Sequence, residues 1–350
     1  MSCPPAPPVA VPVGMVLAAG LGTRLRPLTG LLPKPAVPVA GLPLVQYTFA
    51  RLARGGVRRA AVNTHHLPRE MEGAARGAAR ATGIEVSVSE EPVIAGTGGA
   101  LREARGLLAG AELVVLWNGD VLFDLDLAPL LDAHRRGGAA ATMVLAPMPE
   151  GSGYAAVEVD PGMAVRRIAG RGPGGEELTP LHFTGVHLLS PEILDRVPEE
   201  PFECDINRHV YPPLLASGRV RGLVAPGYWN DLGTPARYLA ANLDLLSGRA
   251  GAALPAADPR SGLEEREPGV FLAGGARVEA GSVLLAPVLV GEGTRVCAGA
   301  AVGPCAVLGS RCLVERGAEV ARAVVWDGTA VRAGERLVDA VAARDLRVPA

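Results

Sequence analysis

The chain is poor in aromatic residues, in net charge and in long hydrophobic runs. Aromatic residues make up 4% of its 350 residues, so aliphatic side chains and alanine must build any core. No apolar stretch approaches the roughly 18 residues of a membrane helix. The net charge of −2 gives no general attraction to nucleic acid or to anionic lipid. We therefore expect neither a nucleic-acid partner nor a membrane partner.

Cysteine is scarce as well. The five cysteines are odd in number and form no CxxC pair, so we expect neither a disulfide framework nor a zinc site. This usage fits a reducing compartment and predicts a cytoplasmic protein. Residues 1–12 are rich in proline and alanine and carry no cation, unlike a secretory signal. We interpret them as a disordered N-terminal tail.

Lysine is nearly absent. Lys34 is the only lysine among 34 cationic residues, and all the others are arginine. A compact ammonium group and a planar guanidinium group are not interchangeable at a phosphate. The isolation of Lys34 therefore makes it a candidate for a functional position.

Strand-like and helix-like segments alternate between residues 13 and 247. The predicted strands cover residues 13–18, 60–63, 84–88, 113–117 and 140–146. The predicted helices between them cover residues 44–53, 69–81 and 127–136. A partly antiparallel section follows at 154–159, 165–168 and 182–189, with further helices near 206–217 and 235–246. This alternation predicts an α/β fold with a mostly parallel sheet and helices on both faces.

A different pattern begins after residues 248–269, which show no period and are interpreted as a linker. Within residues 270–340 aliphatic residues recur every six positions, and Trp326 takes the place after the last of them. The recurring residues are Leu272, Val278, Leu284, Val290, Val296, Val302, Leu308, Val314 and Val320. Such hexapeptide repeats predict a parallel β-helix, here of about three coils.

The loop after the first predicted strand combines glycine with cations. Gly20 and Gly22 let the backbone approach a ligand, and successive N–H groups can cradle phosphate oxygens. Arg24 and Lys34 add the positive charge that suits a triphosphate. A dinucleotide fingerprint would need a third glycine where Leu25 stands. A Walker A loop would need Gly-Lys-Ser/Thr, whereas Lys34 lies between two prolines.

Four ordered motifs resemble the signatures of sugar-1-phosphate nucleotidyltransferases, also called NDP-sugar pyrophosphorylases. They are GLGTRLRPLT at 20–29 with PKP at 33–35, EP at 91–92 with GTGGAL at 96–101, NGD at 118–120, and GYWNDLGTP at 227–235. The resemblance covers about residues 13–247. The tail resembles members similar to mannose-1-phosphate guanylyltransferase, which end in a left-handed β-helix. The family resemblance implies a Rossmann-like fold, dependence on Mg²⁺, and the reaction NTP + sugar 1-phosphate → NDP-sugar + pyrophosphate.

The resemblance also implies roles for individual residues. Asp120 and Asp231 would hold Mg²⁺ against the α-phosphate, because magnesium prefers a few carboxylates together with phosphate oxygens. Arg24 would stabilise the leaving pyrophosphate and Lys34 would contact the reacting phosphates, so Arg24, Lys34 and Asp120 are the catalytic candidates. The candidates for nucleotide binding are Ala18, Ala19, Gly20, Gly22, Thr23, Gly98 and Asn118. The candidates for binding the sugar phosphate are Tyr154, Arg171 and Gly185.

Departures from the family pattern leave the substrates open. Many members carry a lysine in a Glu-Lys-Pro motif on the acceptor side. Here Arg171 is the candidate replacement, and the equal alternative is a solvated loop arginine. Tyr154-Ala155 and Phe183-Thr-Gly185 also depart from the usual residues of the expected sugar pocket. Mannose 1-phosphate and related hexose, heptose or N-acetylated sugar phosphates therefore stay open as acceptors. GTP is the preferred nucleotide.

Two other functions remain as alternatives. Asp124 and Asp126 have the Asp-x-Asp spacing of metal-dependent glycosyltransferases, although capping of the following predicted helix is favoured for them. A non-catalytic homologue that senses nucleotide sugar is the other alternative. The tail contains none of the six histidines, which argues against acyl transfer there. We expect the tail to mediate a homo-oligomer. We expect the run Asn63-Thr-His-His to form the edge of the nucleotide cleft or to cap the sheet, rather than to bind a metal.

Overall fold

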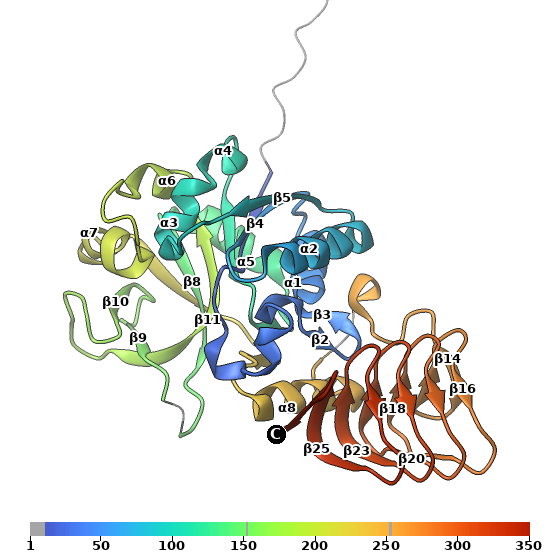
Figure 1. Cartoon of the computed structure of the whole chain (residues 1–350). Helices are drawn as coiled ribbons and strands as arrows, with labels where there is room; N and C mark the ends of the chain where they lie inside the picture. The colour runs from blue at the N-terminus through green and yellow to red at the C-terminus, as the bar shows by residue number, and fades with distance from the viewer. Residues whose placement is uncertain (1–10, 152, 252–253) are drawn as a thin grey trace, which may run out of the picture.

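The computed structural model describes residues 11–151, 153–251 and 254–350, so the predicted tail over 1–12 lies almost wholly outside the described residues. An α/β domain comes first, and a domain of stacked short strands follows it (Figure 1). The last helix of the first domain, α8, lies along the side of the strand domain. No helix in the described ranges is long and apolar enough to cross a membrane.

The first domain is built around one large sheet. Its strands are β1 (Val13–Leu17), β4 (Arg59–Thr64), β5 (Glu85–Glu90), β6 (Val114–Asn118), β8 (Ala141–Pro147), β9 (Ala156–Val159), β10 (Val165–Ile168), β11 (Thr179–Leu189) and β12 (Val220–Val224). The order runs β10-β9-β11-β6-β1-β4-β5, and β8 joins β11 to β12. The predicted parallel pairing is confirmed for β1 with β4 and β6, and for β4 with β5. Strand β11 runs antiparallel to β6, β8 and β9.

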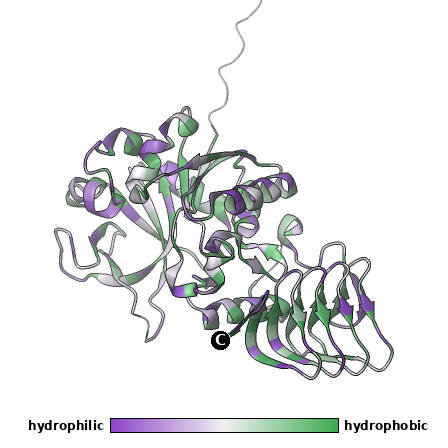
Figure 2. Ribbon diagram, in the orientation of Figure 1, coloured by the Kyte–Doolittle hydropathy of each residue, from purple (hydrophilic) through white to green (hydrophobic). Residues whose placement is uncertain are grey.

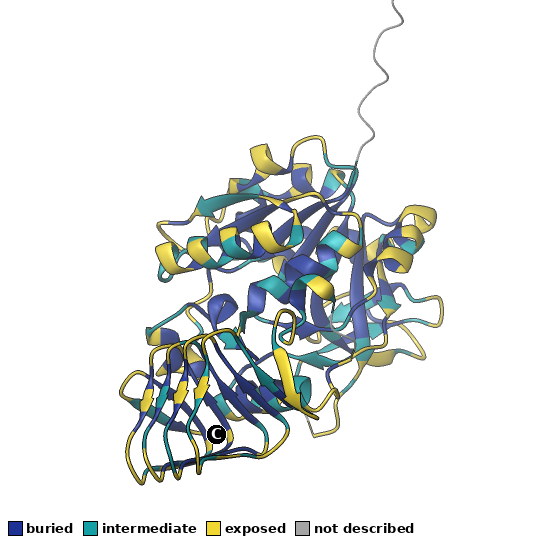
Figure 3. Ribbon diagram, turned by 90° about the vertical axis from the view of Figure 1, so that its right-hand side faces the viewer, coloured by how far each residue is buried: buried dark blue, intermediate teal, exposed yellow. Residues whose placement is uncertain are grey.

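Helices cover both faces of this sheet. They are α1 (Leu44–Arg54), α2 (Pro68–Thr82), α3 (Gly96–Glu103), α4 (Arg105–Leu108), α5 (Leu127–Gly137), α6 (Glu192–Arg196) and α7 (Pro212–Ala216). Helix α8 (Pro235–Leu246) packs against the second domain instead. Alternate residues of β1 face opposite ways, since Met15 packs in the core under α3 and α7 while Val16 packs in the core under α1, α2 and α5. Figure 2 shows the hydrophobic strands in the middle of the domain, and Figure 3 shows them buried beneath exposed helix surfaces. The predicted α/β layering is confirmed.

Several local elements differ from the sequence prediction. The single helix expected near 206–217 is a π-helix at Ile206–Val210 followed by α7, because prolines 212 and 213 have no N–H to continue the ladder. Helix α3 is not expected from the sequence, since its first turn contains three glycines, which are poor helix formers. Strand β12 is also unexpected, because Gly222 interrupts its short apolar run.

The second domain is a stack of coils made from short parallel strands. Its strands are β14 (Glu264–Glu267), β15 (Val270–Leu272), β16 (Arg277–Val278), β17 (Val283–Leu284), β18 (Val288–Val290), β19 (Arg295–Val296), β20 (Ala301–Val302), β21 (Ala306–Leu308), β22 (Leu313–Val314), β23 (Glu319–Val325), β24 (Ala330–Val331), β25 (Arg336–Ala343) and β26 (Leu346–Pro349). Three six-residue repeats close one coil, so that Val270 pairs with Val288 and Val288 pairs with Ala306. One face is the four-stranded sheet β16-β19-β22-β24, so the described coils outnumber the three expected. Strand β14 lies inside the stretch 248–269 that was interpreted as a linker.

Trp326 does not continue the inward row of the six-residue repeat. Leu308 pairs with Val325 rather than with Trp326, because the coil between them is one residue shorter than the earlier coils. Val325 therefore packs inside the stack. Trp326 points the other way and joins the cluster between the two domains.

Alternating side chains attach the stack to helix α8. In β18 the side chains of Val288 and Val290 face the inside of the stack, whereas Leu289 between them joins the cluster between the domains. Trp326 Nε1 donates a hydrogen bond of 2.9 Å to the hydroxyl of Tyr238 on α8. The Tyr238 hydroxyl in turn donates to the carbonyl of Pro38. The second domain thus braces both α8 and the segment just after Lys34.

Replacing Trp326 tests this brace. We expect Trp326→Ala to lower the free energy of unfolding by about 3 kcal/mol, because it removes a large buried side chain from the interface. Trp326→Phe keeps most of the ring and loses the N–H donor, so we expect a loss of about 1 kcal/mol. Thermal or denaturant unfolding measures both. An alanine variant as stable as the unchanged protein would contradict the interface described above.

Candidate active site

A cavity of about 350 Å³ opens at the carboxyl ends of β1 and β6. Ligands of open α/β sheets bind at this edge. Most of the candidates for nucleotide binding and catalysis line the cavity. They are Ala18, Ala19, Gly20, Gly22, Thr23, Arg24, Lys34, Asn118 and Asp120. The structure therefore brings residues from three of the four sequence motifs, together with Gly233 from the fourth, around one space.

The glycine loop after β1 takes a compact shape that needs its small residues. Gly22 has a φ of +59°, and a Cβ on it would lie 2.8 Å from the methyl group of Thr29. The Thr29 hydroxyl donates a 2.9 Å hydrogen bond to the Gly22 carbonyl and closes the loop. Residues Thr23–Leu25 then form a turn of 3₁₀ helix, which carries Arg24 to the mouth of the cavity.

A buried polar pair, Asn63 and Glu91, also lines the cavity. The side-chain amide of Asn63, at the end of β4, donates to a carboxylate oxygen of Glu91 at 2.8 Å. Its amide oxygen accepts from the backbone N–H of Ala18 at 2.7 Å. The second Glu91 oxygen accepts from the N–H of Ala95 at 3.0 Å. Sequence reasoning placed Asn63 in a run at the cleft edge and Glu91 in a family motif, but it named neither side chain as a binding residue. Their positions after parallel strands at this edge were a usable signal.

Gly98 lies behind the wall of the cavity. Its N–H donates to the carbonyl of Cys204 at 2.7 Å, and a Cβ on it would lie 2.6 Å from Cys204 Sγ. The neighbouring Gly96 and Thr97 line the cavity instead. The structure thus gives Gly98 a packing role and does not bring it into the lining.

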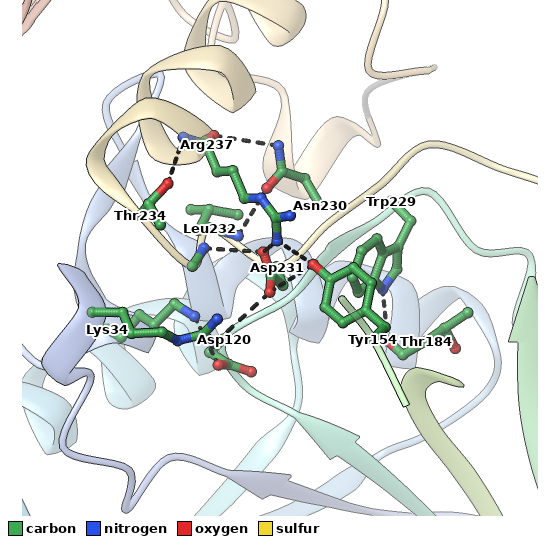
Figure 4. A network of polar contacts seen from close by, with 12 residues as sticks. Lys34, Asp120, Tyr154, Thr184, Trp229, Asn230, Asp231, Leu232, Thr234 and Arg237 are labelled. Carbon is green, nitrogen blue, oxygen red and sulfur yellow. Dashed lines mark hydrogen bonds and ion pairs between the residues drawn. The ribbon is translucent and has the colours of Figure 1, made fainter. Parts of the chain in front are cut away.

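Lys34 and Asp120 form an ion pair in the lining of the cavity. Lys34 Nζ lies 2.8 Å from Asp120 Oδ2 (Figure 4). Lys34 begins the short 3₁₀ helix Lys34–Ala36 and is only 5% exposed. Asp120 follows β6 in a tight turn, where a Cβ on Gly119 would lie 2.8 Å from the Leu17 carbonyl. The narrow setting of Lys34 favours a single ammonium group over a forked guanidinium.

Asp231 receives several donors in the loop before α8. Arg237 Nη1 donates to Asp231 Oδ1 at 2.8 Å, and the Tyr154 hydroxyl donates to Oδ2 at 2.9 Å (Figure 4). The Gly233 N–H donates to Oδ1 at 3.1 Å, and Arg24 Nη2 lies 3.9 Å from Oδ2. Asp231 is 8% exposed, so these contacts fix its carboxylate in place. Sequence reasoning did not single out Arg237.

Asp231 stays ionised although it is buried. Burial alone opposes the charged form, but hydrogen bonds from Arg237 and Tyr154, and the charges of Arg237 and Lys34, outweigh it. The pKa of Asp231 therefore lies below its ordinary value of 3.8. Lys34 thus pairs with Asp120 and also acts on Asp231, and Figure 4 shows both carboxylates beside the same space.

The donor set of the two aspartates fits a hard divalent cation. Carboxylate oxygens suit Mg²⁺, which usually takes one or two of them and fills its shell with water and substrate phosphates. No group of three or more His, Cys, Asp or Glu side chains gathers for a metal among the residues that the structure describes. A cation held by Asp120 and Asp231 would therefore complete its shell with water and phosphate oxygens.

Aromatic rings form a wall beside Asp231. The ring centroids of Tyr154 and His182 are 4.4 Å apart, and those of His182 and Trp229 are 4.3 Å apart. Burial lowers the pKa of His182, so its ring is neutral near pH 7. Gly185 has a φ of +92° and lies so close to Asn118 that a Cβ would come within 3.1 Å of that side chain. Sequence reasoning identified Tyr154 and Gly185 here, but not His182 or Trp229.

Arg171 lies apart from this cluster. It is exposed in the loop after β10, where its backbone bridges to Ile168, and it does not line the cavity. The structure therefore does not bring it to Tyr154 and Gly185 in the way that the resemblance implied.

The Asp-x-Asp pair is also separate from the cavity. Asp124 Oδ1 lies 2.5 Å from Arg51 Nη2 in an ion pair, and Asp124 lines a small neighbouring cavity. Asp126 stands at the N-cap of α5, but its side chain makes no capping hydrogen bond, so that part of the prediction is wrong. His65 contacts the backbone carbonyl of Glu91, and His66 contacts the backbone carbonyl of Thr29.

The sheet-edge cavity, with its glycine loop, Arg24, Lys34 and Asp120, defines an α/β site suited to phosphate-bearing ligands. The nucleotidyl transferase family model matches residues 13–248, and the chain belongs to this family of enzymes. It is 32% identical over 322 residues to mannose-1-phosphate guanylyltransferase of Mycobacterium tuberculosis, covering 91% of this chain and 81% of that one. It is 30% identical over 340 residues to UTP–glucose-1-phosphate uridylyltransferase of Synechocystis, covering 93% and 85%. Mannose-1-phosphate guanylyltransferase 1 of Arabidopsis thaliana is 27% identical over 326 residues, covering 91% and 82%.

The lowered pKa of Asp231 predicts a pH-dependent contribution to stability. A depressed folded-state pKa stabilises the fold above the unfolded-state pKa, near 3.9, and that stabilisation disappears as pH falls through the folded-state value. We expect Asp231→Asn to be less stable than the unchanged protein at pH 7, with the difference closing as pH falls below the unfolded-state pKa and through the lower folded-state pKa. Urea unfolding across this range measures it. An equal difference at all pH values would contradict the assigned ionisation.

Proposed function

We propose that the enzyme transfers a nucleotidyl group from a nucleoside triphosphate to a sugar 1-phosphate and releases an NDP-sugar and pyrophosphate. The observation that carries this proposal is the Lys34–Asp120 ion pair in the lining of the cavity, with Asp231 within reach of the same lysine. Such a site can neutralise two polyanions at once. We take GTP and mannose 1-phosphate as the first substrates to test, because two of the relatives above carry that activity in their names.

Different residues of the site would contact the nucleotide, its phosphates and the metal ion. Backbone groups of Ala18, Ala19, Gly20, Gly22 and Thr23 would face the nucleotide along the loop, with Asn118 across the cavity. Arg24, exposed at the mouth of the cavity, would pair with the leaving pyrophosphate. Lys34 would contact the α-phosphate region, where negative charge develops during transfer. Asp120 and Asp231 would hold Mg²⁺, which supplies Lewis-acid stabilisation of the α-phosphate when it is bound.

The transfer needs positioning more than proton chemistry. The phosphate oxygen of the acceptor is already ionised, so no general base is required. It forms a new bond to the α-phosphorus as the bond from that phosphorus to the bridging oxygen breaks, and the electron pair leaves with pyrophosphate. Fixed cations and dipoles at the cavity lower the repulsion between the two anions. The buried and tightly partnered Lys34 and Asp231 suit this work, because their positions are set before substrate arrives.

The second domain has a separate role in the proposal. Coils of three six-residue repeats with parallel pairing support a left-handed parallel β-helix of the kind that the resemblance implied. We propose that this domain also mediates a homo-oligomer. A glycosyltransferase using Asp124 has no comparable support, since an ion pair to Arg51 engages that carboxylate.

A substrate matrix tests the proposed function. Purified protein is mixed with Mg²⁺, each of GTP, UTP, CTP and ATP, and each of several sugar 1-phosphates, and pyrophosphate release is followed. We expect release only when both substrates are present, fastest with GTP and mannose 1-phosphate. Release without any sugar phosphate, or release of nucleoside diphosphate from a nucleotide sugar instead, would contradict the proposal.

Lys34 and Asp120 provide the sharpest variants. We expect Lys34→Ala and Asp120→Asn each to lower kcat by at least about 100-fold, because each removes charge at the reacting phosphate. Lys34→Arg should also fail to restore activity, since the buried site leaves little room for a fork. Rates come from pyrophosphate release, and circular dichroism checks the fold. Near-normal rates in both Lys34→Ala and Asp120→Asn would reject the assignment.

A further inference from the structure

The reaction proposed above brings two separate phosphate-bearing substrates to one site. Three cations contact its two aspartates: Lys34 pairs with Asp120, while Arg24 and Arg237 pair with Asp231. Arg24 and Lys34 line the nucleotide cavity. Arg237 does not line that cavity and approaches Asp231 from α8. The nucleotide therefore has two cations of its own, and the third lies on the other side of Asp231.

The position of Arg237 is set by the start of α8. Thr234 is the N-cap of this helix, and its hydroxyl accepts a hydrogen bond from the Arg237 N–H. The guanidinium group lies 5.3 Å from the centre of the Tyr154 ring and contacts the Tyr154 hydroxyl through Nη1. Figure 4 shows Arg237, Asp231 and Tyr154 converging, with Trp229 behind the tyrosine. The arginine thus lies where the aromatic wall meets the carboxylate.

The guanidinium group retains donors that can bind an anion. Among the described residues, its contacts to Asp231 and Tyr154 both use Nη1, which leaves Nη2 and Nε available. The side chain is 43% exposed, so a ligand can reach it. A guanidinium group presents two parallel N–H donors that match two oxygens of a phosphate.

We propose that Arg237 binds the phosphate group of the sugar 1-phosphate, with Tyr154 and Trp229 flanking the sugar side. This inference rests on the proposed function and assigns the acceptor site within it. Asp231 then lies between the two substrates, touched by Arg24 from the nucleotide side and by Arg237 from the acceptor side. Arg171, the candidate from sequence reasoning, is exposed in a loop outside this convergence.

Steady-state kinetics of four arginine variants test the assignment. We expect Arg237→Ala to raise KM for the sugar 1-phosphate by at least about tenfold and to change KM for the nucleoside triphosphate by less than about twofold. Arg237→Lys should recover part of the lost affinity for the sugar 1-phosphate, because lysine restores the positive charge without the paired N–H donors of a guanidinium group. Arg171→Ala should leave both KM values nearly unchanged. The matched control is Arg76→Ala, which removes an exposed arginine that pairs with Glu72 on α2 and lies outside the site.

A second comparison separates phosphate binding from mere support of Asp231. Tyr154→Phe removes the other side-chain hydrogen bond to Asp231 and leaves the Arg237 charge in place. If Arg237 only held Asp231, then Arg237→Ala and Tyr154→Phe would lower kcat alike, and direct titration would show Mg²⁺-dependent nucleotide binding weakened in both. Our assignment predicts instead that nucleotide binding by Arg237→Ala stays close to that of the unchanged enzyme.

Two results would overturn the assignment while leaving the proposed function intact. One is an unchanged acceptor KM in Arg237→Ala while the unchanged enzyme forms product. The other is a larger acceptor KM effect in Arg171→Ala than in Arg237→Ala. Failure of the proposed function itself would show earlier, as the absence of pyrophosphate release from the unchanged enzyme with every substrate pair.

Discussion

The site depends on holding two carboxylates beside the same space without letting their repulsion push them apart. Asp120 comes from the end of β6, and Asp231 comes from the loop before α8. Lys34 bonds to the first and lowers the pKa of the second, so one ammonium group acts on both. Arg24 and Arg237 add charge at Asp231 from two directions. The cluster is therefore a balanced ionic assembly in which each carboxylate has a cation beside it.

The fold supplies the rigidity that this assembly needs. Parallel strands bring the glycine loop and Asp120 to one sheet edge. Gly22 and Gly119 lie so close to neighbouring atoms that a larger residue would not fit in these two turns. The strand domain supports the rest, since Trp326 bonds to Tyr238 on α8 and Tyr238 bonds to the Pro38 carbonyl after Lys34. One hydrogen-bond chain thus joins the second domain to the two segments that carry Lys34 and Arg237. Removal of the second domain would loosen both segments at once.

Much of the fold could be predicted from the sequence because its signals are local and periodic. Alternating strand-like and helix-like runs give the α/β layering, and aliphatic residues at every sixth position give the coils. The departure of Trp326 from the repeat was not predicted, because a one-residue shortening of a coil leaves no mark in the repeat until strands are paired. The break between Ile206–Val210 and α7 depends on two prolines, and the effect of proline on a helix can be predicted from the sequence. The π-helix before the break cannot be predicted in this way.

The residues of the candidate site also differ in whether the sequence marks them. Lys34, Asp120 and the glycine loop stand in motifs whose residue types already indicate phosphate chemistry. Arg237 and His182 carry no such mark, because an arginine in the first turn of a helix and a histidine in a strand are ordinary until the chain folds. Their positions come from long-range packing of α8 and β11 around Tyr154. Gly98 shows the reverse case, since its motif suggested a ligand contact and its surroundings show packing against Cys204.

A double-mutant cycle on Asp120→Asn and Asp231→Asn tests whether these two carboxylates act as one unit. Groups that act as one unit show strongly non-additive losses, so removing the second adds little once the first is gone. We expect kcat/KM for pyrophosphate release in the double variant to be within about tenfold of the value for the slower single variant. Losses that multiply fully, as expected for two carboxylates acting at independent places, would contradict it.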